Sequence, residues 1–224
     1  MLIYAFRHGE TDYNTAGLIQ GQLDIPLNEK GRLLARTVGE ALREVSFDAV
    51  FTSPLCRAKE TAALLVAPGE KRRGTAFPVF EDSRLLELNF GDWSGHRFKK
   101  DGFSLPGVTV EEYNLFYTDP FHMKRSPHGE TVQQLCERAG AFFTELVQNP
   151  FLTHKTVLVS THGCALRALL RAAYGHPEDF WHGGFAPNCS YTLLRAEHGS
   201  IAILEEDAVL YDPSLCVNLF VPEK

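Results

Sequence analysis

Three short apolar segments, each followed at once by a polar loop, constrain the fold of this chain more than any other feature. They are Leu2–Phe6, Ala49–Thr52 and Thr156–Ser160. Apolar runs of this length suit strands that are buried on both faces, as in a parallel sheet covered by helices. Two later segments, Ser190–Arg195 and Ser200–Leu204, are predicted to form a hairpin, so we expect a sheet that is mostly parallel but mixed.

Helical signals lie between these strands. Asn28 is the predicted N-cap of one helix, and Ser53-Pro54 are the predicted N-cap and first residue of a second. Thr131 and Gln134 form a capping box before the most regular amphipathic pattern in the chain. This alternation of strands and helices predicts an α/β fold, here a three-layer α/β/α sandwich with a mostly parallel central sheet.

The strand pattern disappears between roughly residues 93 and 130, where Gly, Pro, Phe and Tyr are mixed with basic residues. Thr109 with Glu112 predicts one short capped helix there. A long aromatic-rich insertion usually forms a lid or binding loop, and a plain surface excursion is the alternative. At 224 residues the chain suits one well-packed domain. We therefore expect residues 1–224 to form a single domain, with residues 93–130 inserted as a lid over the active site.

Charge and composition limit the partners of this chain. Its 22 basic and 28 acidic residues give a net charge of −6, which would repel nucleic acid unless the basic residues were gathered on one face. No apolar run approaches the ~18 residues of a membrane span, and the N-terminus lacks the pattern of a secretory signal. The five cysteines are far apart and include no C-x-x-C pair, so neither disulfides nor a zinc site are indicated. A cytoplasmic location is expected.

The three predicted strands lead into unusual polar residues. Arg7 and His8 follow the first strand, the second runs into Arg57, and the third ends at His162. Taken singly, each has a plain structural explanation, such as a surface pair, a cation on a helix surface or a buried core histidine. Ligands in open α/β sheets bind at the carboxyl ends of the strands, so two imidazoles and two guanidiniums are expected to converge on one point.

This combination suits a phosphoryl group. A phosphate dianion needs fixed cations and N–H donors, and arginine binds its oxygens in a bidentate fork. The helix N-termini expected after Ser53 and near Gly163 would add positive dipole ends. A neutral imidazole is a competent nucleophile near pH 7 and can form a phosphohistidine. On these grounds either His8 or His162 could attack the phosphorus.

Four blocks of the chain resemble, in order, the histidine phosphatase superfamily, also called the phosphoglycerate-mutase-like family. They are Arg7–Thr11 continued through Asn14 to Gln20–Asn28, then Thr52–Ala58, Leu86–Gly95 and Thr161–Gly163. The resemblance covers most of the chain, and its motifs are specific. It implies that His8 is the nucleophile and that Glu87 is the general acid, in contact with the substrate. It further implies a set of residues around the phosphoryl group, namely Arg7, Arg57 and His162 on its oxygens, with Asn14, Gln20, Gly21, Ser53 and Gly163 as further substrate-binding residues.

The implied roles are chemically consistent without a metal or other cofactor. Positive and donor groups around the phosphoryl would stabilise its charge as magnesium does in kinases, and the nine histidines lack the H-x-x-x-H or H-E-x-x-H spacing of a metal site. A leaving alkoxide needs a proton, which Glu87 could supply if enclosure and a nearby dianion raised its pKa; a surface glutamate is the alternative. Cys164 is expected to be a small buried residue at a helix start rather than a thiol nucleophile.

The family contains phosphatases, phosphoglycerate mutases and inactive binding modules. The stretch Leu88–Trp93 follows the phosphatase branch rather than the Arg-His-Tyr-Gly type sequence of the mutases. We therefore predict a phosphomonoester hydrolase that acts through a phosphohistidine on a small phosphorylated metabolite. A mutase is the first alternative, because Lys99-Lys100 and Lys124-Arg125 could hold a substrate carboxylate, and a non-catalytic phosphate-binding module is the second. The aromatic residues of the insertion suit either an apolar leaving group or the insertion's own core, namely Phe103, Tyr113, Phe116, Tyr117 and Phe121.

Overall fold

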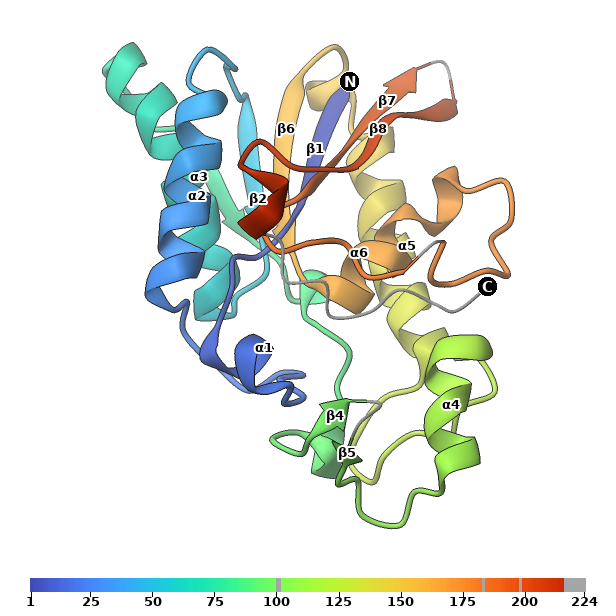
Figure 1. Cartoon of the computed structure of the whole chain (residues 1–224). Coiled ribbons are helices and arrows are strands. Elements are labelled where there is room, and N and C mark those ends of the chain that lie inside the picture. Colours follow the sequence, from blue (N-terminus) through green and yellow to red (C-terminus); the bar gives the residue numbers. More distant parts are fainter. Residues whose placement is uncertain (100–101, 183, 198, 216–224) are drawn as a thin grey trace.

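The computed structural model describes residues 1–99, 102–182, 184–197 and 199–215, and its centre is a six-stranded sheet in the order β3-β2-β6-β1-β7-β8 (Figure 1). The strands are β1 (Leu2–Arg7), β2 (Ala49–Thr52), β3 (Val79–Glu81), β6 (Thr156–Thr161), β7 (Tyr191–Glu197) and β8 (Ser200–Ala208). The first four are parallel to one another, and β7 runs antiparallel to both β1 and β8. The predicted mixed, mostly parallel sheet is confirmed.

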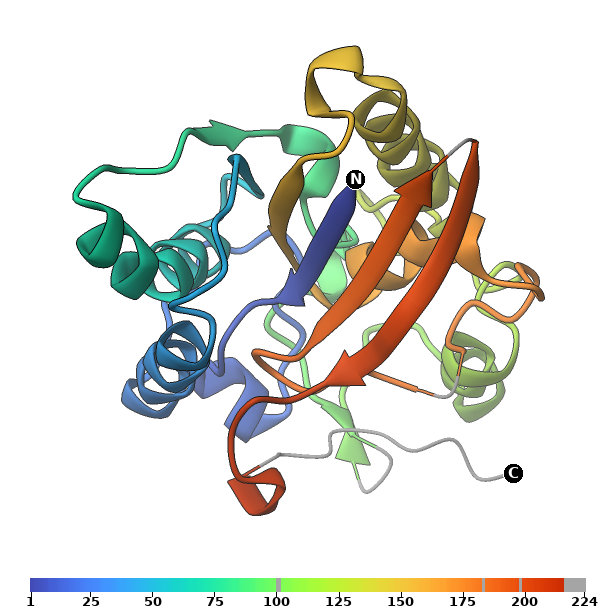
Figure 2. The ribbon, with the colours of Figure 1, turned by 90° about the horizontal axis from the view of Figure 1, so that it is seen from above.

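Helices cover both faces of the sheet, which makes three layers (Figures 1 and 2). On one side lie α2 (Glu29–Ala41) and α3 (Cys56–Arg73), and on the other lie α5 (Val132–Gln148) and α6 (Gly163–Leu170). Along β1, Ile3 and Ala5 pack with residues of α5 and α6, whereas Phe6 packs with residues of α2 and α3. The central strands are therefore buried on both faces, which explains why their sequences are continuously apolar.

The helix starts agree with the capping signals at three places and differ at one. Asn28, Thr109 and Thr131 each cap the helix that follows, the last two with complete capping boxes. Ser53 was the wrong choice of cap, because α3 begins only at Cys56 and its N-cap residue makes no side-chain bond. The hydroxyl oxygen of Ser53 lies instead 2.8 Å from Nε2 of His162, and the helix starts beyond that turn.

Side chains of the insertion, residues 93–130, share a hydrophobic core with α5 and α6. The insertion contains the two-residue strands β4 (Phe98–Lys99) and β5 (Gly102–Phe103) and the helix α4 (Val110–Thr118). Its buried side chains, including Trp93 and Phe116, pack in one cluster with residues of α5 and α6. The two short strands were not predicted, since two residues are too few to show an alternating pattern. In Figure 1 this green segment lies below the sheet, at the end where β1 and β6 finish.

The remaining elements are short. The helix α1 (Asp12–Ala16) follows β1, and single 3₁₀ turns occupy Ser83–Leu85 (η1), Gly91–Trp93 (η2), Pro150–Leu152 (η3), Arg171–Ala173 (η4) and Pro213–Leu215 (η5). Within the described ranges, no helix has both the length and the apolar character needed to cross a membrane.

Candidate active site

The strand order brings the predicted site residues together. β6 lies between β1 and β2, with Arg7 opposite Thr161 in the register. The backbone N–H of His8 donates to the carbonyl of Thr161 at 2.9 Å, and that of Ser53 donates to the carbonyl of Ser160 at 3.0 Å. The sheet ladder thus continues for one residue past the strand ends. These two hydrogen bonds fix the backbone at His8 and Ser53, from which the polar side chains of the site project.

The ring of His8 is held in one tautomer. Its Nδ1 lies 2.6 Å from the carbonyl oxygen of Gly9, and a carbonyl can only accept a hydrogen bond, so Nδ1 carries the proton. The lone pair is therefore on Nε2. Burial, followed by the charges of Arg57 and Arg7, holds the pKa of His8 well below its usual value of 6.5. His8 is consequently a neutral imidazole near pH 7 with a nucleophilic Nε2.

The second imidazole, His162, lies directly beside the first. The centroids of the His8 and His162 rings are 5.1 Å apart. The Nε2 of His162 is 2.8 Å from the hydroxyl oxygen of Ser53, and its Nδ1 is buried with no hydrogen-bond partner among the described residues. Burial first, and then the charge of Arg57, lowers the pKa of His162 well below 6.5.

Two guanidiniums face the same locus. Arg7 Nη1 donates to the carbonyl of Ala186 at 2.5 Å, and Arg57 donates to the carbonyls of Gly21 and Leu23, both at 2.7 Å. Within the described ranges neither arginine forms an ion pair, and the Nε of each is buried without a partner. Burial lowers the pKa of Arg57 to about 10, and both side chains are charged at neutral pH. Glu87 is the main acidic group that acts on both cations, at longer range than an ion pair. Two buried cations without a direct ion pair suit an anion-binding site.

The carboxyl group of Glu87 is fixed at the start of α6. Its Oε1 accepts from the backbone N–H groups of Leu88 at 2.8 Å and Ala165 at 3.0 Å, and its Oε2 accepts from that of Cys164 at 3.2 Å. The N-terminus of α6 was expected to add a positive dipole end to the site, and its N–H groups at Cys164 and Ala165 donate to Glu87. At α3 the N–H of Cys56 likewise donates to a carboxylate, that of Asp24, at 2.7 Å.

A pocket of about 740 Å³ of free space, part of it open to solvent, lies over these groups. Of the predicted site residues it is lined by Arg7, His8, Asn14, Gln20, Gly21, Arg57, Glu87 and Gly163. Ser53 and His162 are fully buried. The rest of the lining is mainly aromatic and aliphatic, with Phe90, Phe98, Phe116, Tyr117 and Phe185 prominent. The pocket lining therefore combines cationic and apolar side chains.

Two of the four candidates for an additional basic patch, Lys124 and Arg125, do not line this pocket. The ammonium of Lys124 is 2.9 Å from a carboxylate oxygen of Glu112, and neither Lys124 nor Arg125 is among the described residues that line this pocket. Lys100 and the side chain of Lys99 fall outside the described part of the chain, as does the side chain of Phe103. Of the other aromatic candidates, Phe116 and Tyr117 line the pocket and Tyr113 is buried in the shared core.

Asn188 is a site residue that the sequence did not reveal. Its Nδ2 donates to the carbonyl of His8 at 3.0 Å and to Asn14 Oδ1 at 3.4 Å, while its own Oδ1 is buried without a described partner. It belongs to the loop before β7, which matches no motif and shows no periodicity. Asn14 and Gln20 in turn meet at Thr11, whose hydroxyl lies 3.1 Å from Asn14 Oδ1 and 2.9 Å from Gln20 Oε1.

Nothing in the described part of the chain gathers three or more histidine, cysteine, aspartate or glutamate side chains into a metal-binding group. Cys164 is buried at the start of α6, as expected, and burial raises the pKa of its thiol well above the usual value.

The chain is similar to known proteins over most of its length. The sequence matches the model of the histidine phosphatase superfamily (branch 1) over residues 3–207. An uncharacterized phosphatase, PhoE, of Bacillus subtilis is 34% identical over 173 residues, or 77% of each chain. A 2,3-bisphosphoglycerate-dependent phosphoglycerate mutase of Gloeobacter violaceus is 32% identical over 169 residues, 75% of this chain and 74% of its own. Among solved structures, Bacillus stearothermophilus YhfR matches with a TM-score of 0.80 and 31% identity, covering 93% of this chain and 97% of that one.

Proposed function

The chain belongs to the histidine phosphatase superfamily, and on that basis we propose that it is a metal-independent phosphomonoester hydrolase that works through a phosphohistidine at His8. One observation carries the proposal. A neutral imidazole with its lone pair on Nε2 lies near two buried guanidiniums that form no direct ion pair in the described structure. The arginines supply the positive charge that a transferring phosphoryl group requires.

In the first step the Nε2 of His8 attacks the phosphorus, and the bond from phosphorus to the ester oxygen breaks. Glu87, protonated, gives its proton to the departing oxygen, so the product leaves as a neutral alcohol. Arg7 and Arg57 hold the phosphoryl oxygens, and the positive charge that develops on His8 is spread over its ring, whose Nδ1–H remains bonded to the carbonyl of Gly9.

In the second step water attacks the phosphohistidine. The bond from phosphorus to Nε2 breaks, and the Glu87 carboxylate takes a proton from the attacking water. Inorganic phosphate leaves, and His8 returns to its neutral form. The hydrogen bonds from Leu88, Cys164 and Ala165 aim the Glu87 carboxyl at the pocket in both steps.

His162 is proposed to bind a phosphoryl oxygen through Nδ1. The backbone N–H of Leu55 donates to the Ser53 hydroxyl oxygen at 3.4 Å, so that hydroxyl is free to donate its own hydrogen to His162 Nε2. An Nε2 that accepts leaves the proton on Nδ1. The buried Nδ1 that lacks a described partner is then a hydrogen-bond donor, which is what a phosphoryl oxygen needs.

The apolar part of the pocket lining suggests the class of substrate. Phe98, Phe116 and Tyr117 of the insertion, together with Phe185, line the same pocket as His8 and the two arginines. We propose that the insertion acts as a lid over the leaving group, and that an aryl or other apolar leaving group fits best. A phosphoglycerate would need a cation for its carboxylate, and the described lining offers only the two arginines already assigned to phosphate.

A panel of phosphomonoesters tests this function. We expect phenyl and naphthyl phosphates to be hydrolysed with a higher kcat/KM than 3-phosphoglycerate or sugar phosphates. The same preparation should be assayed for conversion of 3-phosphoglycerate to 2-phosphoglycerate, with His8→Ala as the inactive control. Mutase turnover that exceeds hydrolysis would contradict the proposal and favour the reaction type of the Gloeobacter relative. Binding of phosphate analogues without turnover of any ester would favour a binding module.

A further inference from the structure

We propose that Arg138, on α5 and outside the pocket, is the positioning residue that sets the place of Glu87 in the reaction. The inference rests on the proposed function, because it concerns the residue assigned there as the acid. Arg138 is not among the described residues that line the pocket. It therefore acts through the chain segment that carries Glu87 and does not touch the substrate.

The segment that carries Glu87 has no regular secondary structure of its own. Residues 86–90 lie between two 3₁₀ turns and belong to neither a helix nor a strand. The backbone carbonyls of Leu86 and Glu87 have no sheet or helix partner within the described ranges, yet Glu87 is largely buried. Buried carbonyls without partners are costly, so an external donor is required to hold such a segment in one conformation.

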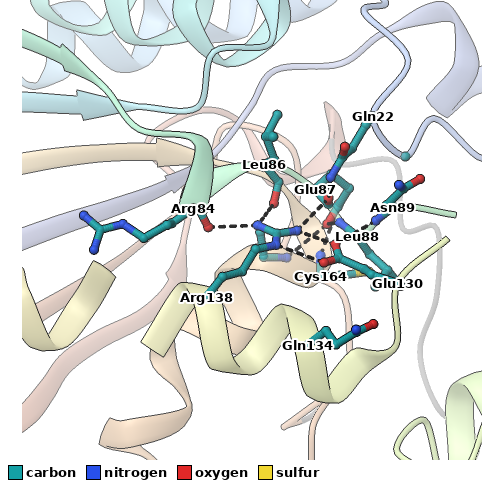
Figure 3. A network of polar contacts seen from close by, with 12 residues as sticks. Gln22, Arg84, Leu86, Glu87, Leu88, Asn89, Glu130, Gln134, Arg138 and Cys164 are labelled. Carbon is teal, nitrogen blue, oxygen red and sulfur yellow. Dashed lines mark hydrogen bonds and ion pairs between the residues drawn. The ribbon is translucent and has the colours of Figure 1, made fainter. Parts of the chain in front are cut away.

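Arg138 is that donor (Figure 3). Its Nη1 donates to the carbonyls of Arg84 at 2.8 Å and Leu86 at 2.6 Å, and its Nη2 donates to the carbonyl of Glu87 itself at 2.9 Å. One planar guanidinium therefore fixes three carbonyls within four residues. Gln22 adds a second donor to the Glu87 carbonyl, with its Nε2 at 3.0 Å.

Glu130 binds both Arg138 and the segment that carries Glu87, and we call the contacts of Arg138 and Glu130 with this segment the Arg138 clamp. Its carboxylate accepts from Arg138 Nε at 3.1 Å and Nη2 at 2.5 Å, and its Oε1 also accepts from the backbone N–H of Asn89 at 2.9 Å. The backbone N–H of Glu130 donates to the carbonyl of Asn89 at 2.9 Å. Both side chains are sheltered, with 20% of Arg138 and 16% of Glu130 exposed, so solvent screens this ion pair less than one on the open surface.

Glu87 is thus held at both ends. The start of α6 binds its carboxyl, and Arg138 binds its backbone. An acid that must reach the departing oxygen loses efficiency when it is displaced by about 1 Å. Loss of Arg138 should therefore impair the step that needs the acid more than the step that does not. A merely structural role would instead slow all substrates alike.

Esters with different leaving groups distinguish a role of Arg138 in positioning Glu87 from a merely structural role. An alkyl phosphate needs a proton on its leaving oxygen, whereas the phenolate of p-nitrophenyl phosphate leaves without one. We would measure single-turnover phosphoenzyme formation from both esters in the wild type, Glu87→Gln, Arg138→Met and the double variant. Arg84→Met is a matched control, because it removes an arginine and its two ion pairs from the same segment but leaves the Arg138 clamp intact. Arg138→Lys, which keeps the charge but not the fork, is the variant to use if Arg138→Met does not fold.

We expect Arg138→Met to slow the alkyl ester by at least about tenfold, within the ~10²–10⁴ that an acid contributes, and to change the p-nitrophenyl rate by less than about threefold. In the Glu87→Gln background the Arg138 substitution should have no further effect on the alkyl ester. Equal slowing of both esters, or additive losses in the double variant, would overturn the positioning role while Glu87→Gln still shows the contrast. If Glu87→Gln itself shows no contrast between the esters, the acid role fails, and the positioning of an acid fails with it.

Discussion

The imidazole rings of His8 and His162 lie 5.1 Å apart between centroids, with their planes at 58°, and each ring has one nitrogen engaged by a neighbour. His8 uses Nδ1 toward the carbonyl of Gly9, and His162 uses Nε2 toward the hydroxyl of Ser53. These two neighbours differ, because the Gly9 carbonyl can only accept a hydrogen bond whereas the Ser53 hydroxyl can donate one. The paired rings are thereby fitted for different tasks, one as a nucleophile and the other as a donor.

Ser53→Ala should reduce the rate of phosphoenzyme formation by about fivefold, for alkyl and aryl phosphates alike. The substitution removes the donor to His162 Nε2, and one hydrogen bond is worth roughly 1 kcal/mol. Stopped-flow measurements on both esters provide the comparison. Ser190→Ala is the matched control, because the Ser190 hydroxyl is also buried but has no described partner. A loss confined to alkyl esters would assign Ser53 to the acid step instead.

The free energy of unfolding should fall as the pH drops below 6.5. The folded-state pKa of both His8 and His162 is lowered well below 6.5, chiefly by burial, so the unfolded chain takes up protons in a range where the folded protein does not. Each histidine then costs about 1.4 kcal/mol per pH unit between 6.5 and its folded pKa. Urea titrations at pH 7 and pH 5 measure this slope. His162→Asn should lose less stability between these pH values than the wild type, and an unchanged slope would contradict the assignment.

Phe185→Ala should raise KM for naphthyl phosphate by about tenfold and leave KM for a small alkyl phosphate nearly unchanged. Phe185 lines the pocket, and losing part of an aromatic contact costs about 1–2 kcal/mol. Phe151→Ala, at a side chain that is 86% exposed, is the control. Equal KM changes for the two esters would remove Phe185 from the leaving-group site.

Chelation with excess EDTA should leave hydrolysis unchanged. Arg7 and Arg57 are assigned the charge stabilisation that a divalent ion would otherwise provide. Activity that is lost after dialysis against chelator and restored by Mg²⁺ or Zn²⁺ would contradict this assignment.

The sequence predicted those parts of the molecule that depend on local chemistry. The buried strands and the caps at Asn28, Thr109 and Thr131 follow from apolar runs and capping residues, and the structure confirms them. The convergence of Arg7, His8 and Arg57 on one pocket could be predicted because parallel strands end at the same edge of a sheet.

Features that depend on long-range contacts could not be predicted. Asn188 reaches His8 across 180 residues, and Arg138 meets Glu87 across 51, with no local pattern at either position. Ser53 illustrates the same limit, because its partner His162, the N-cap residue of α6, rather than the helix that follows Ser53, decides what its hydroxyl does. The single-domain organisation, the cytoplasmic location and the exclusion of nucleic acid stay predictions.

The most direct test of the account is to trap the phosphoenzyme. The protein is mixed with ³²P-labelled phenyl phosphate, quenched in base within milliseconds, digested and mapped by mass spectrometry. We predict one acid-labile, base-stable phosphate on His8, absent from His8→Ala and present in His162→Ala wherever that variant still turns over. Label on His162, on Cys164 or on the His8→Ala protein would contradict the assignment of His8 as the nucleophile.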